Sequence, residues 1–407
     1  MKNLVLLTTY FPFGTKEPFL ETEIFFLSKK FDTIYVIATK PDSLIRREVP
    51  NNLIVLTYPK HNIFLKSIIV LIKHGFSTVK YIFHDIHHVT QNQDSLLFAR
   101  ILKLAKHIIK AFLIMDFITK SIPLKIDQYL IYSYWFNSAA LTAGLLKKKH
   151  SNFTAISRLH RWDLYSENNN YNYLPLQQTK AILLDKCFFI SDQGKRYFEN
   201  KYGILPSYFV SKLGVMKQTN VVLEPLDCRF HIVSCSYLHP GKRVNYIIEA
   251  LALIDELDLH WTHIGGGDLF EELNAYANAK IGLKRNISFK FTNNYSKQEV
   301  LEFYKENYVH LFINTSISEG LPVAIMEAMS YAIPVIATDV GGTSEIVNET
   351  CGLLIDKNCS HDDIKRGIMN IYSNYATYPY RKNAFYNWLN NFNAEINYSR
   401  FSDQILS

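Results

Sequence analysis

This chain of 407 residues lacks the long apolar runs that a membrane protein needs. No segment reaches the roughly 18 uninterrupted apolar residues of a spanning helix, because Lys66, Lys73, Lys110 and Asp116 interrupt the most apolar stretches. The apolar run at 4–7 is too short for a signal peptide and has no small-residue cleavage site after it. The sequence therefore predicts a cytoplasmic chain that is soluble or peripheral to the membrane.

Cysteine is also scarce. The five cysteines are an odd number, form no Cys-x-x-Cys pair and have no histidine partners at the spacing of a zinc site. Unpaired thiols fit a reducing cytoplasm. A disulfide scaffold and a structural zinc site are therefore excluded as the basis of the fold.

Acidic residues are under-represented in the first half of the chain. Residues 1–215 contain 28 Lys or Arg against 15 Asp or Glu, whereas residues 216–407 contain 16 against 22. This asymmetry indicates that the N-terminal half faces an anionic partner, either lipid headgroups or nucleic acid. The chain contains no known module with aromatic residues among exposed basic ones, so we expect no nucleic-acid partner.

Short β-branched runs alternate with amphipathic helical patterns along the whole chain, which is typical of βα units around parallel sheets. At roughly 150 residues per domain, the length suits two domains. The sequence predicts an α/β fold of two Rossmann-like domains with six strands each. We expect the domains at 1–215 and 230–385, a polar linker at 216–229, and a helical tail at 386–407 that crosses back to the first domain. Ligands should bind at the carboxyl ends of the strands, in a cleft between the two sheets.

Residues 97–113 predict an amphipathic helix with one apolar face and a stripe of basic residues beside it. Such a helix fits an anionic bilayer interface, but it equally fits a core-facing helix with a solvated outer side. The wider segment 60–125 holds ten Lys or Arg, six His and three Asp, which favours the membrane interpretation slightly. The stripe consists of Arg100, Lys103, His107 and Lys110.

The segment SEGLPVAIMEAM at 318–329 is the most informative in the chain, and it follows an apolar run at 309–313. Pro322 at a first helical position indicates that a helix begins there. The preceding turn, with Gly320 and Leu321, would then present free backbone N–H groups beside the helix N-terminus. A diphosphate or a polarised sugar hydroxyl would fit that position.

Two carboxylates lie eight positions apart in this segment. Glu327 falls about a turn and a half inside an apolar helix, where an unpaired carboxylate is costly, so it needs partners such as the two hydroxyls of a ribose. The alternative makes Glu327 a surface or salt-bridged residue and Glu319 a helix cap. A second glycine-rich turn at 340–345 follows the next predicted strand, as if it lined the same cleft, and favours the ligand-binding interpretation.

The Glu-x7-Glu spacing, the EGLP turn and the stretch PVIATDVGGTSEIV at 334–347 resemble family 4 of the retaining glycosyltransferases. The resemblance implies a GT-B fold, in which two Rossmann-like domains face each other, and a reaction without metal or cofactor. It implies that Glu327 holds the donor ribose, that Glu319 contacts the donor sugar, and that the amides around 320–322 bind sugar and phosphate.

Residues 232–244 predict a strand, a loop and a helix start that carries Lys242, a compact cation suited to a departing diphosphate. In the family an Arg precedes this Lys, and both cations hold the diphosphate. Tyr237 occupies the Arg position here, which either weakens the stabilisation of the leaving group or transfers it to Arg243. An ordinary exposed lysine remains the alternative for Lys242.

The segment SRLHRWDLY at 157–165 resembles the family pattern R-x-H-x-x-D-x-Y. The resemblance implies that His160 lies beside the donor sugar at the reaction centre, with Arg158 and Asp163 in supporting roles. A lone histidine is more often a structural residue, and that alternative stays open.

Two further turns contain glycine and are family-like. In the turn after the first predicted strand, at 9–21, Gly14 would let the backbone approach a ligand closely. Gly266 lies in a similar strand-to-helix turn at 265–268.

Departure of a nucleoside diphosphate requires cations behind the phosphate and carboxylates near the sugar. Lys242, the helix that begins at Pro322, and Glu319 would supply them. No DxD-like pair stands at a strand end, so we expect no metal, and the nucleotide sugar is a co-substrate. The resemblance implies retention of configuration by front-face substitution.

Within the family, the FPFGTKEPFLETEI start and the RLHRWDLY segment resemble enzymes of capsule, exopolysaccharide or O-antigen assembly. The expected partners are therefore a UDP- or GDP-sugar, a glycan or undecaprenyl-linked glycan acceptor, and the inner face of the cytoplasmic membrane through residues 60–125.

Other functions remain open. An epimerase or phosphorylase of the same fold would turn over without a glycan acceptor, and a silent glycan-binding scaffold, for which Tyr237 is the support, would bind without releasing nucleotide. A glycosidase that uses Glu319 and Glu327 does not fit, because one turn-helix unit cannot flank a scissile bond from two sides.

Overall fold

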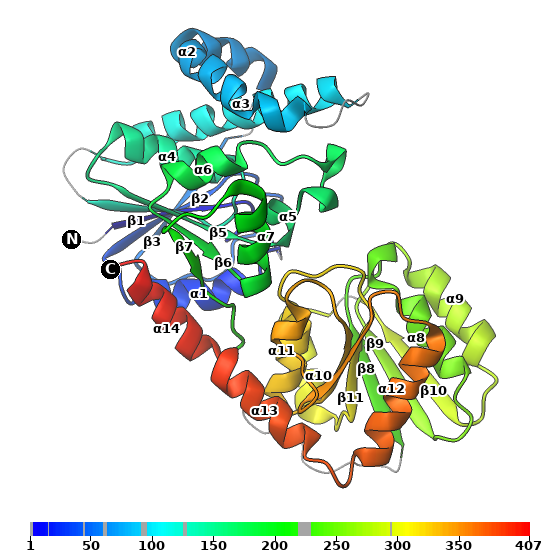
Figure 1. The fold of residues 1–407 in the computed structure, drawn as a ribbon. Helices are drawn as coiled ribbons and strands as arrows, with labels where there is room; N and C mark the ends of the chain where they lie inside the picture. The colour runs from blue at the N-terminus through cyan, green and yellow to red at the C-terminus, as the bar shows by residue number, and fades with distance from the viewer. Residues whose placement is uncertain are drawn as a thin grey trace. The chain divides into compact units, whose positions relative to one another are not determined.

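The computed structural model describes residues 3–14, 16–43, 45–59, 63–90, 96–124, 128–218, 229–293 and 295–407. They form two compact units, one of residues 1–211 with 398–407 and one of residues 212–397. Each unit is a parallel sheet flanked by helices (Figure 1), so the predicted α/β fold is confirmed. Most of the expected linker at 216–229 lies outside the described residues.

The first unit contains a seven-stranded sheet in the order β3-β2-β1-β4-β5-β6-β7. The sequence predicts the first six strands but misses β7, which is only three residues long. The strands are β1 (Asn3–Thr8), β2 (Thr33–Ala38), β3 (Leu53–Thr57), β4 (Tyr129–Ser133), β5 (Thr154–Leu159), β6 (Lys186–Phe189) and β7 (Tyr208–Val210). The helices are α1 (Phe19–Ser28), α2 (Ile63–Thr90), α3 (Leu97–Ser121), α4 (Ser138–Lys149), α5 (Arg161–Leu164), α6 (Gln177–Leu183) and α7 (Asp192–Tyr202), with short 3-10 turns η1 (Ser166–Asn168) and η2 (Asn170–Asn172).

The second unit contains a six-stranded sheet in the order β10-β9-β8-β11-β12-β13. Its strands are β8 (Phe230–Cys235), β9 (Leu259–Ile264), β10 (Ile287–Thr292), β11 (Leu311–Asn314), β12 (Val335–Thr338) and β13 (Gly352–Ile355). Its helices are α8 (Val244–Ala252), α9 (Phe270–Ile281), α10 (Lys297–Glu306), α11 (Val323–Ser330), α12 (His361–Asn374) and α13 (Tyr380–Asn391), with 3-10 turns η3 (Pro240–Lys242) and η4 (Gly341–Glu345). The last helix, α14 (Ala394–Gln404), contributes residues to both units.

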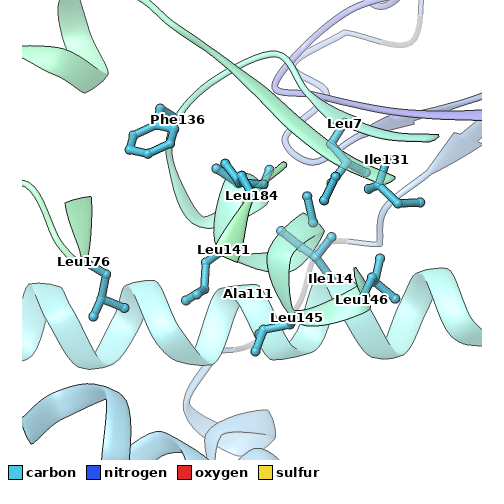
Figure 2. Packing of buried hydrophobic residues seen from close by; sticks show 14 of the residues in the cluster. Leu7, Ala111, Ile114, Ile131, Phe136, Leu141, Leu145, Leu146, Leu176 and Leu184 are labelled. Atoms are coloured by element: carbon cyan, nitrogen blue, oxygen red, sulfur yellow. The ribbon is translucent and has the colours of Figure 1, made fainter. Parts of the chain in front are cut away.

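The core of the first unit fills the space between the sheet and the helices α3 and α4. Figure 2 shows Ala111 and Ile114 of α3 packed with Leu141 and Leu145 of α4, close to Ile131 of β4. All of these side chains are buried. Strands covered on both faces read as continuous apolar runs, which is why β1 and β4 have no alternating pattern.

The C-terminal part of the apolar face of the predicted helix 97–113 lies in the protein core. Ile108, Ile109 and Phe112 are buried there. Arg100 is buried as well, and its guanidinium donates to the carbonyls of Tyr171 (3.0 Å) and Val89 (3.4 Å). These buried residues support the core-facing alternative for this part of the helix. Phe98 and Leu102 of the predicted apolar face are exposed, and contact of the helix with a membrane stays a prediction.

Among the helices that the described residues form, none combines the length and the apolarity needed to cross a bilayer.

The C-terminal end of α14 packs on the first unit. Phe401 is fully buried against Tyr132 and Phe188, and its ring centre lies 4.0 Å from the Arg158 guanidinium. Lys30 and Asp403 form an ion pair at 2.7 Å on the outer side. The last ten residues thus complete the core of the first unit.

Candidate functional site

The order of the second sheet determines where its chemistry collects. From β8 the chain adds β9 and β10 on one side of that strand and then crosses to β11 on its other side. The strands β8 and β11 are therefore neighbours, and the loops that follow them lead in opposite directions along the sheet. Ligands bind at such a switch point, at the carboxyl ends of the strands. A cavity of about 470 Å³ lies there. Its lining includes Cys235, Tyr237, Lys242, Gly266, Asn314, Glu319, Pro322, Val323 and Ala324.

Lys242 and Glu319 meet in this cavity. The Lys242 ammonium lies 2.6 Å from a Glu319 carboxylate oxygen, and Asn314 donates to the same oxygen at 3.4 Å. Burial favours the neutral acid, but the charge of Lys242, with hydrogen bonds from Lys242, Ser316 and Asn314, outweighs burial and holds the pKa of Glu319 below its usual value. Glu319 is therefore an ionised carboxylate beside the cation, and Lys242 is not an ordinary exposed lysine.

The N-terminus of α11 opens onto the same cavity. Pro322 caps the helix with an extended backbone and α11 begins at Val323, one residue later than predicted. The first backbone N–H groups of a helix have no intrahelical partner, and Val323 and Ala324 line the cavity. Leu321 is buried and is not among the lining residues. The geometry supplies an anion site next to Lys242.

A second turn supports the one that carries Glu319. The Gly342 N–H donates to the Gly320 carbonyl at 2.7 Å. Gly341 has a φ of +57°, and a Cβ atom there would lie 1.9 Å from the Glu319 carbonyl oxygen. Only glycine allows this approach. The predicted turn at 340–345 thus packs against the turn that carries Glu319 and stabilises it.

Glu327 lies on α11, half-buried and outside the lining of this cavity. No described residue forms an ion pair or a hydrogen bond with its carboxylate, so the salt-bridged alternative is not observed. Burial raises the pKa of Glu327 to about 7, only partly opposed by Lys297. When it is ionised, the Glu327 carboxylate still needs hydrogen-bond donors, and the sequence analysis expects these to be the two hydroxyls of a ribose.

Arg243 lies away from the cavity. Its backbone is left-handed (φ 47°), and its guanidinium donates to the carbonyls of Thr315 and Lys357, both at 2.8 Å. The side chain therefore holds loops together, and the predicted donor contact for Arg243 is not supported. Tyr237 does line the cavity, where its hydroxyl donates to Asp268 at 2.9 Å. Lys242 is thus the cationic side chain among the lining residues.

Sequence reasoning missed Cys235 and Asn314, the last residues of β8 and β11. Their position at strand ends is a usable signal in a doubly wound sheet. Burial raises the pKa of Cys235 to about 12, so Cys235 is a neutral thiol rather than a nucleophile.

His160 follows β5 in the first unit, where it is the N-cap of α5, and it lies in an aromatic cage. Its ring centre is 4.6 Å from that of Tyr134, 4.7 Å from Trp135 and 6.2 Å from Phe19. Burial, with a contribution from Arg158, holds the pKa of His160 well below its usual value. Its Nε2 has no hydrogen-bond partner in the described part of the chain. A neutral imidazole with an unused buried nitrogen fits a ligand contact better than a structural role.

The two supporting residues of this motif act differently. Asp163 accepts hydrogen bonds from the backbone N–H groups of His160 (2.7 Å) and Phe136 (2.6 Å), so it positions His160. Arg158 is buried in the core, where it pairs with Glu23 at 2.8 Å. The predicted orienting role fits Asp163, whereas Arg158 shapes the packing behind the strand.

The loop after β1 is held by a residue that sequence analysis did not single out. Glu17 is buried, and it accepts from the N–H groups of Thr9 (3.1 Å), Tyr10 (2.7 Å) and Phe11 (2.6 Å) and from the Trp135 indole. Glu17 thus fastens the loop beside the His160 cage. The backbone of Glu17 is left-handed, with a φ of 58°, and no sequence pattern predicts this conformation.

Gly14 lies farther along the same loop, with a φ of +63°, and its carbonyl accepts from Arg47 Nε at 2.6 Å. It is not among the residues that line either of the two cavities described here.

A second cavity, of about 550 Å³, lies in the first unit. Its lining combines the apolar Phe98 and Leu102 with Lys106, Trp162 and Tyr171. The turn that carries Tyr171 is fixed from α3, where Lys103 donates to the carbonyls of Asn170 (3.1 Å) and Tyr173 (2.5 Å). Tyr171 itself has a φ of 67°.

Within the described residues, no three His, Cys, Asp or Glu side chains gather where they could hold a metal ion.

Comparisons with known proteins agree with this geometry. Residues 224–388 match the model of the glycosyl transferases group 1 family. The chain is 27% identical over 253 residues to an uncharacterized glycosyltransferase of Methanocaldococcus jannaschii, which covers 60% of this chain and 66% of the relative. It is 33% identical over 140 residues to the O-antigen biosynthesis glycosyltransferase WbnH of Escherichia coli, covering 34% and 36%.

Among solved structures, HepE of Anabaena in complex with UDP covers 100% of both chains, with a TM-score of 0.66 and 16% identity. The match extends the fold to the whole chain. The chain spans about a third to two thirds of the length of the two curated relatives.

The fold is therefore the GT-B fold of glycosyltransferases. More narrowly, residues 224–388 are similar to the glycosyl transferases group 1 family, whose model they match.

Proposed function

We propose that this chain is a retaining glycosyltransferase that transfers a sugar from a UDP-sugar to a lipid-linked glycan. One observation carries the proposal: Lys242 and Glu319 lie 2.6 Å apart beside the N-terminus of α11, at the switch point of the second sheet. UDP is chosen as the nucleotide because the HepE structure contains it, and the acceptor class follows from the O-antigen relative and the sequence resemblance.

Lys242 and the N-terminus of α11 bind the diphosphate in this proposal. As the bond between the sugar and the diphosphate breaks, negative charge grows on the phosphate oxygen, and the ammonium and the free N–H groups stabilise it. The same two groups neutralise the diphosphate without a metal, so we expect turnover to persist in excess EDTA.

Glu319 contacts the donor sugar in this proposal. The Glu319 carboxylate exchanges its ion pair with Lys242 for contact with the donor sugar, whose ring becomes positive as the leaving group departs. The unused Nε2 of the neutral His160 accepts from a sugar hydroxyl. Glu327 accepts from the ribose hydroxyls. Retention by front-face substitution remains the family expectation, with the donor phosphate assisting removal of the acceptor proton.

The second cavity is our candidate for the acceptor. Aromatic faces from Trp162 and Tyr171 suit the rings of a glycan, and Lys106 suits the phosphate of a lipid carrier. An undecaprenyl-linked acceptor would bring the chain to the inner face of the cytoplasmic membrane.

The test is a turnover assay with UDP- and GDP-sugars, with and without a lipid-linked glycan acceptor. The proposal predicts release of UDP only with acceptor, and an NMR spectrum of the product that shows the donor's anomeric configuration. Lys242→Ala should abolish most of the release, whereas the exposed Lys305→Ala should not.

The same assay separates the competing functions. UDP release or sugar conversion without acceptor would indicate an epimerase or phosphorylase. Donor binding without release under any condition would indicate a glycan-binding scaffold.

A further inference from the structure

One side of α2 presents a row of exposed apolar side chains, which we call the α2 stripe. The helix is kinked at His74, which has non-helical φ and ψ angles of −128° and 16°, so the row runs along two helical segments. Its members recur at helical spacings of three and four, and their exposed fractions run from 37% to 88%. Phe76 and Ile72 are the most exposed, at 88% and 83%. The stripe consists of Ile68, Ile69, Ile72, Phe76, Val79, Phe83 and Ile86.

Folding of the unit does not require this stripe. The opposite face of α2 is the one that packs, with Val70, Thr78, Tyr81 and Val89 buried. That face lies on α3, which in turn packs on α4, so α2 is the outermost layer of the helices on this side of the sheet (Figure 1). A contiguous exposed apolar patch of this length is a docking surface rather than a by-product of folding.

The charges around the stripe identify its partner. The segment 63–90 contains a single acidic residue, Asp85, and that carboxylate is buried, where it accepts from the Leu176 N–H (2.7 Å) and the Tyr173 hydroxyl. The exposed side chains beside the stripe include Lys73 and Lys80 and the histidines His84 and His87. Lys73 is partly neutralised by Asp116 at 2.5 Å. No exposed carboxylate on α2 opposes an anionic partner.

We propose that the α2 stripe lies in the surface of an anionic lipid bilayer, with its apolar side chains in the acyl boundary and Lys80 at the headgroups. A second copy of the chain is disfavoured, because pairing two stripes would bring two sets of lysines together. The proposal rests on the proposed function for the membrane as a partner and identifies the surface that contacts it. Vesicle binding requires neither donor nor turnover, so the two proposals can fail separately.

The experiment is co-sedimentation of the full chain with vesicles of phosphatidylglycerol and phosphatidylcholine, compared with phosphatidylcholine alone. The wild type should bind the anionic vesicles and lose binding as salt increases. The double variant Ile72→Ser/Phe76→Ser should weaken partitioning by at least roughly tenfold, because two large side chains no longer leave water. Lys80→Glu should weaken it for the anionic vesicles only.

The matched control is Ile182→Ser/Leu283→Ser, which removes two equally exposed apolar side chains elsewhere and should partition as the wild type does. Circular dichroism and UDP binding should be unchanged in both double variants, so a failure here is distinct from a failure of the proposed function. The proposal would be overturned if the wild type did not bind anionic vesicles, or if Ile72→Ser/Phe76→Ser bound them as well as the wild type does. A dimer in light scattering that dissociates in Ile72→Ser/Phe76→Ser would also overturn it in favour of self-association.

Discussion

Among single residues, Lys242 is the one on which our proposal depends most. It is the cation that lines the cavity, and its ammonium lies within 2.6 Å of Glu319. We expect Lys242→Met to lower kcat by about 10²–10³, as loss of one preorganised charge does. Steady-state kinetics would measure this, with Lys305→Met, an exposed lysine on α10, as the control. A Lys242→Met enzyme with normal kcat would assign the leaving group to another residue.

Glu327 gives the donor site a pH dependence. Because burial raises the pKa of Glu327 to about 7, the carboxyl of the free protein is largely protonated below that pH and cannot accept from two hydroxyls. Donor affinity should therefore increase as the pH rises through about 7, and one pH unit below it should be reduced by roughly tenfold. Calorimetry with UDP across this range would show the change.

The matched variant is Glu327→Gln, which keeps the shape but not the charge. It should bind UDP more weakly and without the rise through pH 7. A rise that persists in Glu327→Gln would assign the pH dependence to another group.

The sequence predicts the site residues that lie within recognisable motifs. Glu319, Lys242 and His160 stand in patterns that predict their environments, and the structure brings the first two together. Glu17 and Arg243 could not be assigned in this way. Their roles depend on positive φ values and on carbonyls from distant loops, neither of which a motif records.

At the scale of elements, the turn η4 holds the loop that carries Glu319. Gly341→Ala would place a Cβ 1.9 Å from the Glu319 carbonyl, at a φ of +57°. We expect a loss of about 1–3 kcal/mol in the free energy of unfolding, together with weaker UDP binding. Gly75→Ala is the control, since a Cβ there would meet nothing within 4 Å. Equal melting curves for both variants would contradict the packing of the two turns.

Helical periodicity predicts which face of a helix is apolar, but the helices α2 and α3 show that it does not predict what packs on that face. Periodicity identifies the apolar face of 97–113 correctly but does not say what covers it. The hairpin of α2 with α3 decides this, because α3 lies inside and α2 outside. Most of the exposed large apolar side chains of this hairpin therefore lie on α2, which the sequence analysis did not single out within 60–125.

At the scale of the molecule, the C-terminal residues are part of the first unit. Phe401 is fully buried in the core of that unit, and its ring centre lies 4.0 Å from the Arg158 guanidinium. Phe401→Ala should lower the free energy of unfolding of that unit by about 3–5 kcal/mol, measured by urea denaturation. Leu283→Ala, at a residue that is 96% exposed, should have little effect. A Phe401→Ala protein as stable as the wild type would show that the tail is dispensable.

The overall architecture was predictable because alternating strands and helices with short loops allow few topologies. Twelve of the thirteen strands of the described residues were expected from apolar runs. The sequence predicts that the tail at 386–407 crosses back to the first domain. It does not predict the packing of Phe401 with Arg158 and Phe188, because local patterns do not contain such long-range contacts.

We propose that the cavity of the second unit binds a nucleoside diphosphate through Lys242 and the N-terminus of α11. Titration calorimetry with UDP, GDP and ADP on the wild type, Lys242→Ala and the control Lys305→Ala would test this binding. We expect the wild type and Lys305→Ala to bind UDP alike and Lys242→Ala to bind it at least roughly tenfold more weakly. Equal UDP affinity in all three proteins, or no binding of any of the three nucleotides, would contradict the proposal.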